Sequence, residues 1–258
     1  MVIAALVMWF TSDASLAIDP YMAAYLARAT DGFAYSSPVA AAAAAWCAGR
    51  LTSAGSDDPM RRSLRPIWRQ VWPLFAAQGV AFVVIVVVQV TRKTPTTIGS
   101  PLVLITAAAI VTTAIVVGCV IGTVLPIPVA IVGSFAVIFA WVSVPPTDGT
   151  NLSWRHIAGY SVYTCCDFVP HALDWRAALA PVLPAVASIF ALVMLRERRS
   201  VSRVGTAACA MVVAVVLATL LCQGTTPDGN TDRVAGENRA PALAHLSSVE
   251  QALIATAT

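Results

Sequence analysis

The side chains of this sequence that are best suited to chemistry gather in one short stretch. His156, Cys165, Cys166, Asp167 and His171 fall close together along the chain. Cysteine thiolates and histidine nitrogens are the ligands that soft metals such as Zn²⁺ or Cu(I) prefer. A metal site made of His156, Cys165, Cys166 and His171 is therefore one interpretation of this stretch.

A disulfide is a second interpretation, and we favour it over the metal site. The topology argued below places this stretch on the outer side of a membrane, and Cys222 at the outer end of the last apolar segment. That side is oxidising, which favours disulfides over free thiolates. We expect either Cys165 or Cys166 to bridge to Cys222, with uncommitted thiols as the third alternative. We predict no metal site.

The long apolar segments contain no group for acid–base or ion chemistry. Residues 73–90, 102–144, 177–195 and 204–222 contain no Asp, Glu, Lys, Arg or His. Ion-coupled transporters usually keep such groups at mid-membrane, and membrane-embedded hydrolases also need them. No phosphate-binding loop and no hydrolase or dinucleotide motif occurs either. We therefore expect no enzymatic activity of its own, no cofactor and no nucleic-acid partner.

The composition is that of a membrane protein. The chain is 58% hydrophobic and 11% charged, with a mean hydropathy of +0.78, whereas a soluble domain is about 25% charged. We predict an all-α fold, a polytopic transmembrane helical bundle. The basic residues are almost all arginine, which is typical of a high-GC bacterial genome, so we expect the bacterial plasma membrane.

About six or seven membrane spans are predicted within residues 1–224. Gly122 to Pro128 divides the uncharged stretch 102–144 into two spans, because glycine and proline break helices. Residues 225–258 are predicted to form a partly disordered external tail, in which apolar residues at intervals of three or four (243, 246, 249 and 253) indicate a short amphipathic helix. The predicted spans are 1–10 (shortened), 32–49, 73–90, 101–122, 127–144, 177–195 and 204–222.

The segment 57–72 is predicted to be a cytoplasmic amphipathic helix. Its apolar residues recur at helical spacing and fall on one side, while arginines gather on the other. Pro66 interrupts the pattern, so we expect a short helix and a kink before the apolar run that starts at Pro73. The apolar side is Met60, Leu64, Ile67, Trp68, Val71 and Trp72, and the basic side is Arg62, Arg65 and Arg69.

The basic clusters set the predicted orientation. Loops rich in arginine stay in the cytoplasm, and the arginines at 50, 61, 62, 65 and 69 mark the loop before the third span. A second cluster, at 196, 198, 199 and 203, falls on the same predicted side. The N-terminus is then cytoplasmic and the C-terminal tail external. Arg92 and Lys93 depart from this pattern. The tryptophans near span ends are interpreted as an interfacial belt.

Two interpretations of the amphipathic segment stay open. An apolar face with an arginine-rich back is typical of a helix that lies on anionic lipid. The same surface suits a cytoplasmic partner, because a transporter subunit without an ATP site must receive force through a cytoplasmic loop. The predicted docking residues are Met60, Arg62, Leu64, Arg65, Ile67, Trp68 and Arg69.

The layout resembles a known group of proteins. A short first span is followed by an alanine-rich span ending in Trp46-Cys47-Ala48-Gly49-Arg50, a basic amphipathic loop and the remaining spans. With the loop segments 153–156, 165–166 and 174–177, this resembles the membrane subunits of actinobacterial ABC exporters. The resemblance implies a permease-like subunit, a dimer of such subunits, and a separate cytoplasmic ABC ATPase that powers export.

A different class of function is the alternative to the exporter. The chain would then be a non-transporting membrane partner, such as an immunity, regulatory or scaffold protein. It would act through the external loop 145–176 and the tail.

Overall fold

The structure is a computed structural model that describes residues 32–53, 65–92, 102–147, 157, 175–197 and 201–222. All regular elements within these residues are helices, so the predicted all-α fold is confirmed for this part of the chain. The helices are α3 (Phe33–Ser53), α4 (Arg65–Arg92), α5 (Leu102–Val124), α6 (Ile127–Thr147), α8 (Trp175–Leu179), α9 (Val182–Glu197) and α10 (Val201–Cys222).

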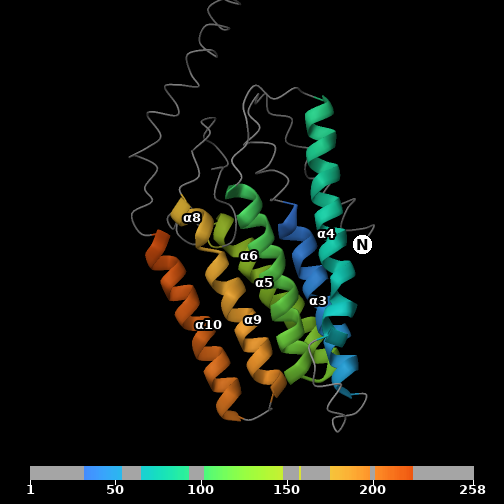
Figure 1. Cartoon of the computed structure of the whole chain (residues 1–258), viewed down its shortest axis with the longest axis vertical. Helices are drawn as coiled ribbons and strands as arrows, with labels where there is room; N and C mark the ends of the chain where they lie inside the picture. The colour runs from blue at the N-terminus through green and yellow to red at the C-terminus, as the bar shows by residue number, and fades with distance from the viewer. Residues whose placement is uncertain are drawn as a thin grey trace, which may run out of the picture.

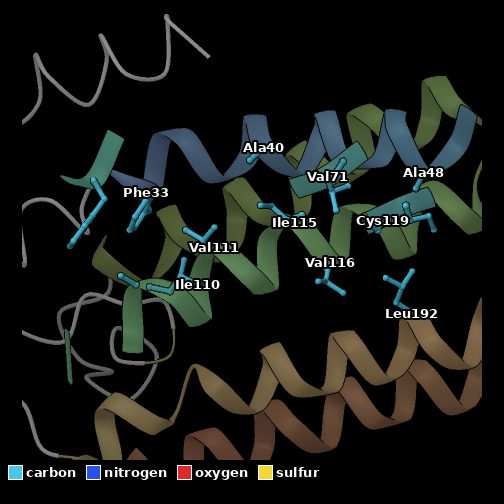
Figure 2. Packing of buried hydrophobic residues seen from close by; sticks show 14 of the residues in the cluster. Phe33, Ala40, Ala48, Val71, Ile110, Val111, Ile115, Val116, Cys119 and Leu192 are labelled. Carbon is cyan, nitrogen blue, oxygen red and sulfur yellow. The ribbon is translucent and has the colours of Figure 1, made fainter. Parts of the chain in front are cut away.

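The long helices lie side by side in one bundle, with α5 at its centre (Figure 1). Helix α5 contacts α3, α4, α6, α8 and α9, whereas α4 and α10 lie at opposite edges. The main core cluster joins α5 residues to α3, α4 and α9; Ala40, Ala48, Ile115, Cys119 and Leu192 are among its members (Figure 2). The main core cluster is therefore made mostly of aliphatic side chains.

Helices α3 and α5 approach each other so closely that only small residues fit between them. A Cβ atom built on Gly118 would overlap the backbone of Ala41, and one on Gly122 would overlap the backbone of Ala45. One turn further along α3, a Cβ on Gly49 would lie 2.8 Å from Cγ1 of Ile127. Small residues four apart on both helices form the contact that membrane helices use for close packing. The register fixes α3 and α5 as parallel neighbours.

The predicted division of the uncharged stretch is present. Helix α5 ends at Val124 and α6 begins at Ile127, after Leu125 and Pro126. The amide N–H groups of Leu125 and Ala130 still donate to carbonyls four residues earlier, at 2.9 Å each. The turn is tight because these bonds satisfy backbone groups on both sides of the break.

The prediction of one continuous span over 177–195 is wrong in detail. The short helix α8 ends at Leu179, and α9 begins at Val182 after a turn at Ala180 and Pro181. Proline has no amide hydrogen to donate, so it breaks the helical hydrogen-bond pattern here. Helix α8 therefore stands apart from the long helix that follows it.

Helix α4 also differs from the prediction, because the expected break before the apolar run is absent. The helix runs unbroken from Arg65 to Arg92, with Pro73 inside it. Pro66 is the second residue of the helix, where proline is well tolerated. Pro73 leaves the carbonyl of Arg69 without its usual donor, but both residues are exposed, so water can hydrate that carbonyl. The basic residues and the apolar run form one rod.

The outer surface of the described bundle exposes many large apolar side chains. Val83, Val132, Val186 and Val212, on four different helices, are each more than half exposed. Contiguous exposed apolar surface marks contact with lipid or with protein. Three helices contain segments long and apolar enough to cross a membrane, namely Arg65–Val88, Leu104–Val124 and Ser202–Cys222, and shorter apolar stretches cover Ile127–Ser143 and Val182–Leu195.

Several predicted features lie outside the described residues. These are the shortened first span, the external tail with its amphipathic helix, and most of the loop between α6 and α8.

Candidate functional site at the basic end of the bundle

Several arginine residues belong to the end of the bundle where α3, α5 and α9 end and α4, α6 and α10 begin. We call this the basic end. It is the lower end of the bundle in Figure 1. Among the described residues, the arginines at 50, 65, 69, 196 and 203 lie there with Glu197, whereas Arg92 and Arg176 belong to the opposite end. The described residues of the two ends therefore differ in charge.

The first two turns of α4 form the exposed part of this end. Arg65, Trp68, Arg69 and Trp72 are all exposed, with Trp68 at 53% and Trp72 at 55%. The Trp68 ring lies 5.8 Å from the Trp72 ring and 5.4 Å from the Phe75 ring, centroid to centroid. This cluster of tilted aromatic rings is typical of tryptophans at a membrane–water interface or in a protein interface.

The structure corrects the predicted apolar face of this segment. Ile67 and Val71 are 2% and 3% exposed and belong to the main core cluster, whereas Trp68 and Trp72 point outward. Ile67 is therefore unavailable to a partner in this conformation. The reason is that α4 packs on its neighbours through a face narrower than the sequence pattern suggested. In these turns that face contains one residue per turn, Ile67 and then Val71. Met60, Arg62 and Leu64 lie outside the described residues.

A second pair of the same composition closes α3. The Arg50 guanidinium lies 4.9 Å from the centroid of the Trp46 ring, one turn earlier on the helix. Both side chains are exposed, with Trp46 at 45%. Stacking over an indole holds a guanidinium in place while leaving its edge free to meet an anion.

Arg203 ties two helices together at the basic end. Its Nη1 donates a hydrogen bond of 3.2 Å to the carbonyl of Met194. That carbonyl is one of the last four of α9, which have no partner within their own helix. A positive side chain at a helix C-terminus is also electrostatically favourable. Arg203 therefore has a structural role that the sequence did not predict.

Cys222, one of the cysteines in the predicted disulfide, lies at the opposite end of the bundle. Cys222, at the end of α10, is buried with Ile157, Ala180 and Ala218, and Trp141 packs against them. Its proposed partners Cys165 and Cys166 lie outside the described residues, as do His156 and His171. The disulfide stays a prediction. Cys47 and Cys119 pack in or against the main core cluster, whereas Cys209 is exposed on α10.

A polar contact inside the bundle escaped the sequence analysis. The Ser36 hydroxyl of α3 donates to Oε1 of Gln78 of α4 at 2.8 Å, and Nε2 of Gln78 donates to the Ser36 carbonyl at 3.3 Å. Both residues are buried, at 1% and 6% exposed. The signal was a carboxamide in the middle of an apolar run, which needs a partner in lipid.

The other buried hydroxyls of the described helices differ from this pair. Those of Thr113, Thr123, Ser134 and Ser188 donate to carbonyls of their own helices. Their hydrogen bonds stay within one helix, so they do not link neighbouring helices. The Ser37 hydroxyl is buried without a hydrogen-bond partner.

No protein-family model matches the chain, and no curated protein or solved structure is significantly similar to it.

Proposed function

We propose that the chain is an integral protein of the bacterial plasma membrane with its basic end in the cytoplasm. The apolar outer surface supports insertion in lipid. Helices of 21 to 23 residues, such as α3, α5 and α10, are about 32–35 Å long, close to the roughly 30 Å thickness of a hydrocarbon core. The excess of arginine at one end supports the orientation.

We propose further that the chain is the permease-like, membrane-spanning subunit of an ABC-type exporter, working as a dimer and powered by a separate cytoplasmic ATPase. One observation carries this proposal. The exposed Arg65, Trp68 and Arg69 stand on the same unbroken helix that continues to Arg92. A push on the first turns of such a rod moves its far end, because the rod has no loop to absorb the motion.

The chemistry of this surface suits a protein partner. Tryptophan and arginine are the residues that most often anchor protein interfaces. Ile67 and Val71 pack inward from the same turns, so a partner bound outside is coupled to the core inside. Anionic lipid is the competing occupant, since headgroups also attract arginine and tryptophan.

Co-purification tests the proposal. The tagged chain is expressed in its native host and extracted in mild detergent, and the bound proteins are identified. The double variant Arg65→Ala/Arg69→Ala is compared with Arg176→Ala, which removes an exposed arginine at the opposite end. We expect an ATPase with a phosphate-binding loop to bind the wild type and Arg176→Ala. The double variant is expected to bind at least tenfold less.

A purified ATPase then gives the second readout. Its ATP hydrolysis is measured with the chain in vesicles of neutral lipid and in vesicles containing anionic lipid. Stimulation by the wild type in both, and its loss with the double variant, supports docking. If no ATPase is recovered while known permease pairs survive the same extraction, the exporter is abandoned. The non-transporting membrane partner then becomes the working function.

A further inference from the structure

Helix α4 is held to the bundle more sparingly than the central helices. Of its most apolar window only 22% is buried, against 61% for α5. It lies at the edge of the bundle and extends beyond its neighbours (Figure 1). Among the described helices, its main contacts are with α3 and α5. Gly79 on α4 has open space around it, in contrast to the glycines of α5. The rotation of α4 therefore rests on one narrow buried face, to which Ile67, Val71 and Phe82 contribute apolar side chains and Gln78 a polar one.

The Ser36–Gln78 pair adds two directional hydrogen bonds between α3 and α4 to this apolar packing. Each residue both donates and accepts, so the two bonds close a ring between α3 and α4. Near it, the Phe33 and Phe82 rings stack with centroids 5.7 Å apart. Gln78 lies midway along α4, 13 residues from Arg65, which is about 20 Å along the helix. Ser36 lies in the first turn of α3, near the end of the bundle opposite the basic end, so the contact is remote from Trp68 and Arg69.

We infer that Gln78 is a positioning residue, and that its ring of hydrogen bonds with Ser36 reinforces the rotation of α4 that core packing favours and so keeps Trp68 and Arg69 directed outward at the basic end. A carboxamide turned toward lipid has no partner, whereas one turned toward Ser36 has two. The preference for one rotation is thus set about 20 Å along α4 from Arg65 and determines which side chains face outward at the basic end. This inference rests on the proposed function only in assigning a use to that end.

A graded pair of variants separates this role from ordinary packing. Ser36→Ala removes the hydroxyl donor and leaves the backbone carbonyl as acceptor, so one bond remains. Gln78→Met removes both bonds and keeps an unbranched side chain of similar length. Thr113→Val is the matched control, because the buried Thr113 hydroxyl bonds to Ala109 of its own helix at 2.8 Å and joins no helices.

The readout is a distance at the basic end, far from the substituted atoms. Spin labels are placed at Ser53 and Gln70, both exposed, in a background without native cysteines, and their separation is measured by pulsed electron resonance in nanodiscs. We expect one narrow distance distribution for the wild type and Thr113→Val. The distribution should broaden at least twofold for Gln78→Met, with Ser36→Ala between them.

Two results overturn the inference. One is an unchanged distribution in Gln78→Met, which reduces Gln78 to a local contact. The other is equal broadening in Thr113→Val, which assigns the effect to general loss of packing. Circular dichroism on the same samples establishes that each variant is folded, and a variant that fails this check is replaced by Gln78→Leu. The distances involve this chain alone, so they leave the ATPase experiment to decide the docking proposal separately.

Discussion

Two glycines of α5 occupy positions where even a methyl group has no room. We expect Gly118→Ala and Gly122→Ala each to lower the free energy of unfolding by about 1–3 kcal/mol, because α3 must move away to admit the new atom. The controls are Gly133→Ala and Gly205→Ala, which place the same methyl group in open space. These are expected to be neutral, or stabilising by up to about 1 kcal/mol through helix propensity.

Unfolding by denaturant in mixed micelles measures these four variants on one scale. Equal stability changes at all four glycines would contradict the close α3–α5 contact. The two α5 glycines, four residues apart, were visible in the sequence, but their partner helix was not. A glycine in a helix indicates that another segment can come close, but it does not identify that segment.

Ser36 and Ser37 are neighbours in sequence with opposite expected behaviour. Ser37 continues the row of small residues Ala41, Ala45 and Gly49 on α3, so its size is what the packing requires. Its hydroxyl has no partner, and we expect Ser37→Ala to be neutral or to stabilise by about 1 kcal/mol. Ser36→Ala loses a bond to Gln78 and is expected to cost about 0.5–1.5 kcal/mol. The same unfolding assay tests the pair, and a larger loss from Ser37→Ala would contradict this assignment.

Arg203 of α10 hydrogen-bonds to the Met194 carbonyl of α9 at the basic end. We expect Arg203→Ala to speed hydrogen exchange several-fold at the amides of the last turn of α9, because the Met194 carbonyl loses its donor and the helix end frays. Arg176→Ala, at the opposite end, serves as the control. Mass spectrometry of the exchanging chain measures both. Unchanged exchange in Arg203→Ala would mean that the turn is held by other contacts.

The helices themselves were largely predictable, because long apolar runs bounded by arginine, glycine or proline leave few alternatives. The described helices α3, α4, α5, α6, α9 and α10 each overlap a predicted span. Pro181 and Pro73 illustrate what sequence cannot decide. Helix α8 ends before Pro181, whereas α4 continues through Pro73, although both prolines lack the amide hydrogen that a helix interior uses.

The candidate site was predictable in composition but not in facing. The arginine and tryptophan content of residues 65–72 was evident, whereas the inward direction of Ile67 depends on where α3 and α5 lie. Gln78 was passed over because a neutral side chain carries no charge to draw notice. Its role depends on a hydroxyl 42 residues away, and such long-range pairing is not encoded in local periodicity.

At the scale of the whole molecule, the protein is an apolar bundle whose described residues include more arginines at one end than at the other. Exposed valines and phenylalanines cover its sides, the described arginines favour one end, and a single rod joins that end to the other. The docking proposal depends on which end faces the cytoplasm. If the orientation were reversed, an ATPase could not reach Arg65 or Arg69.

The measurement that tests this most directly is thiol labelling from one side of the membrane. Single cysteines at Ser53 and Thr91, both exposed and at opposite ends of the bundle, are introduced into a chain without native cysteines. Intact cells are treated with a maleimide that does not cross membranes. The account predicts labelling at 91 in intact cells, and labelling at 53 only after the cells are permeabilised. Labelling at 53 in intact cells with protection at 91 would contradict the orientation and, with it, the docking proposal.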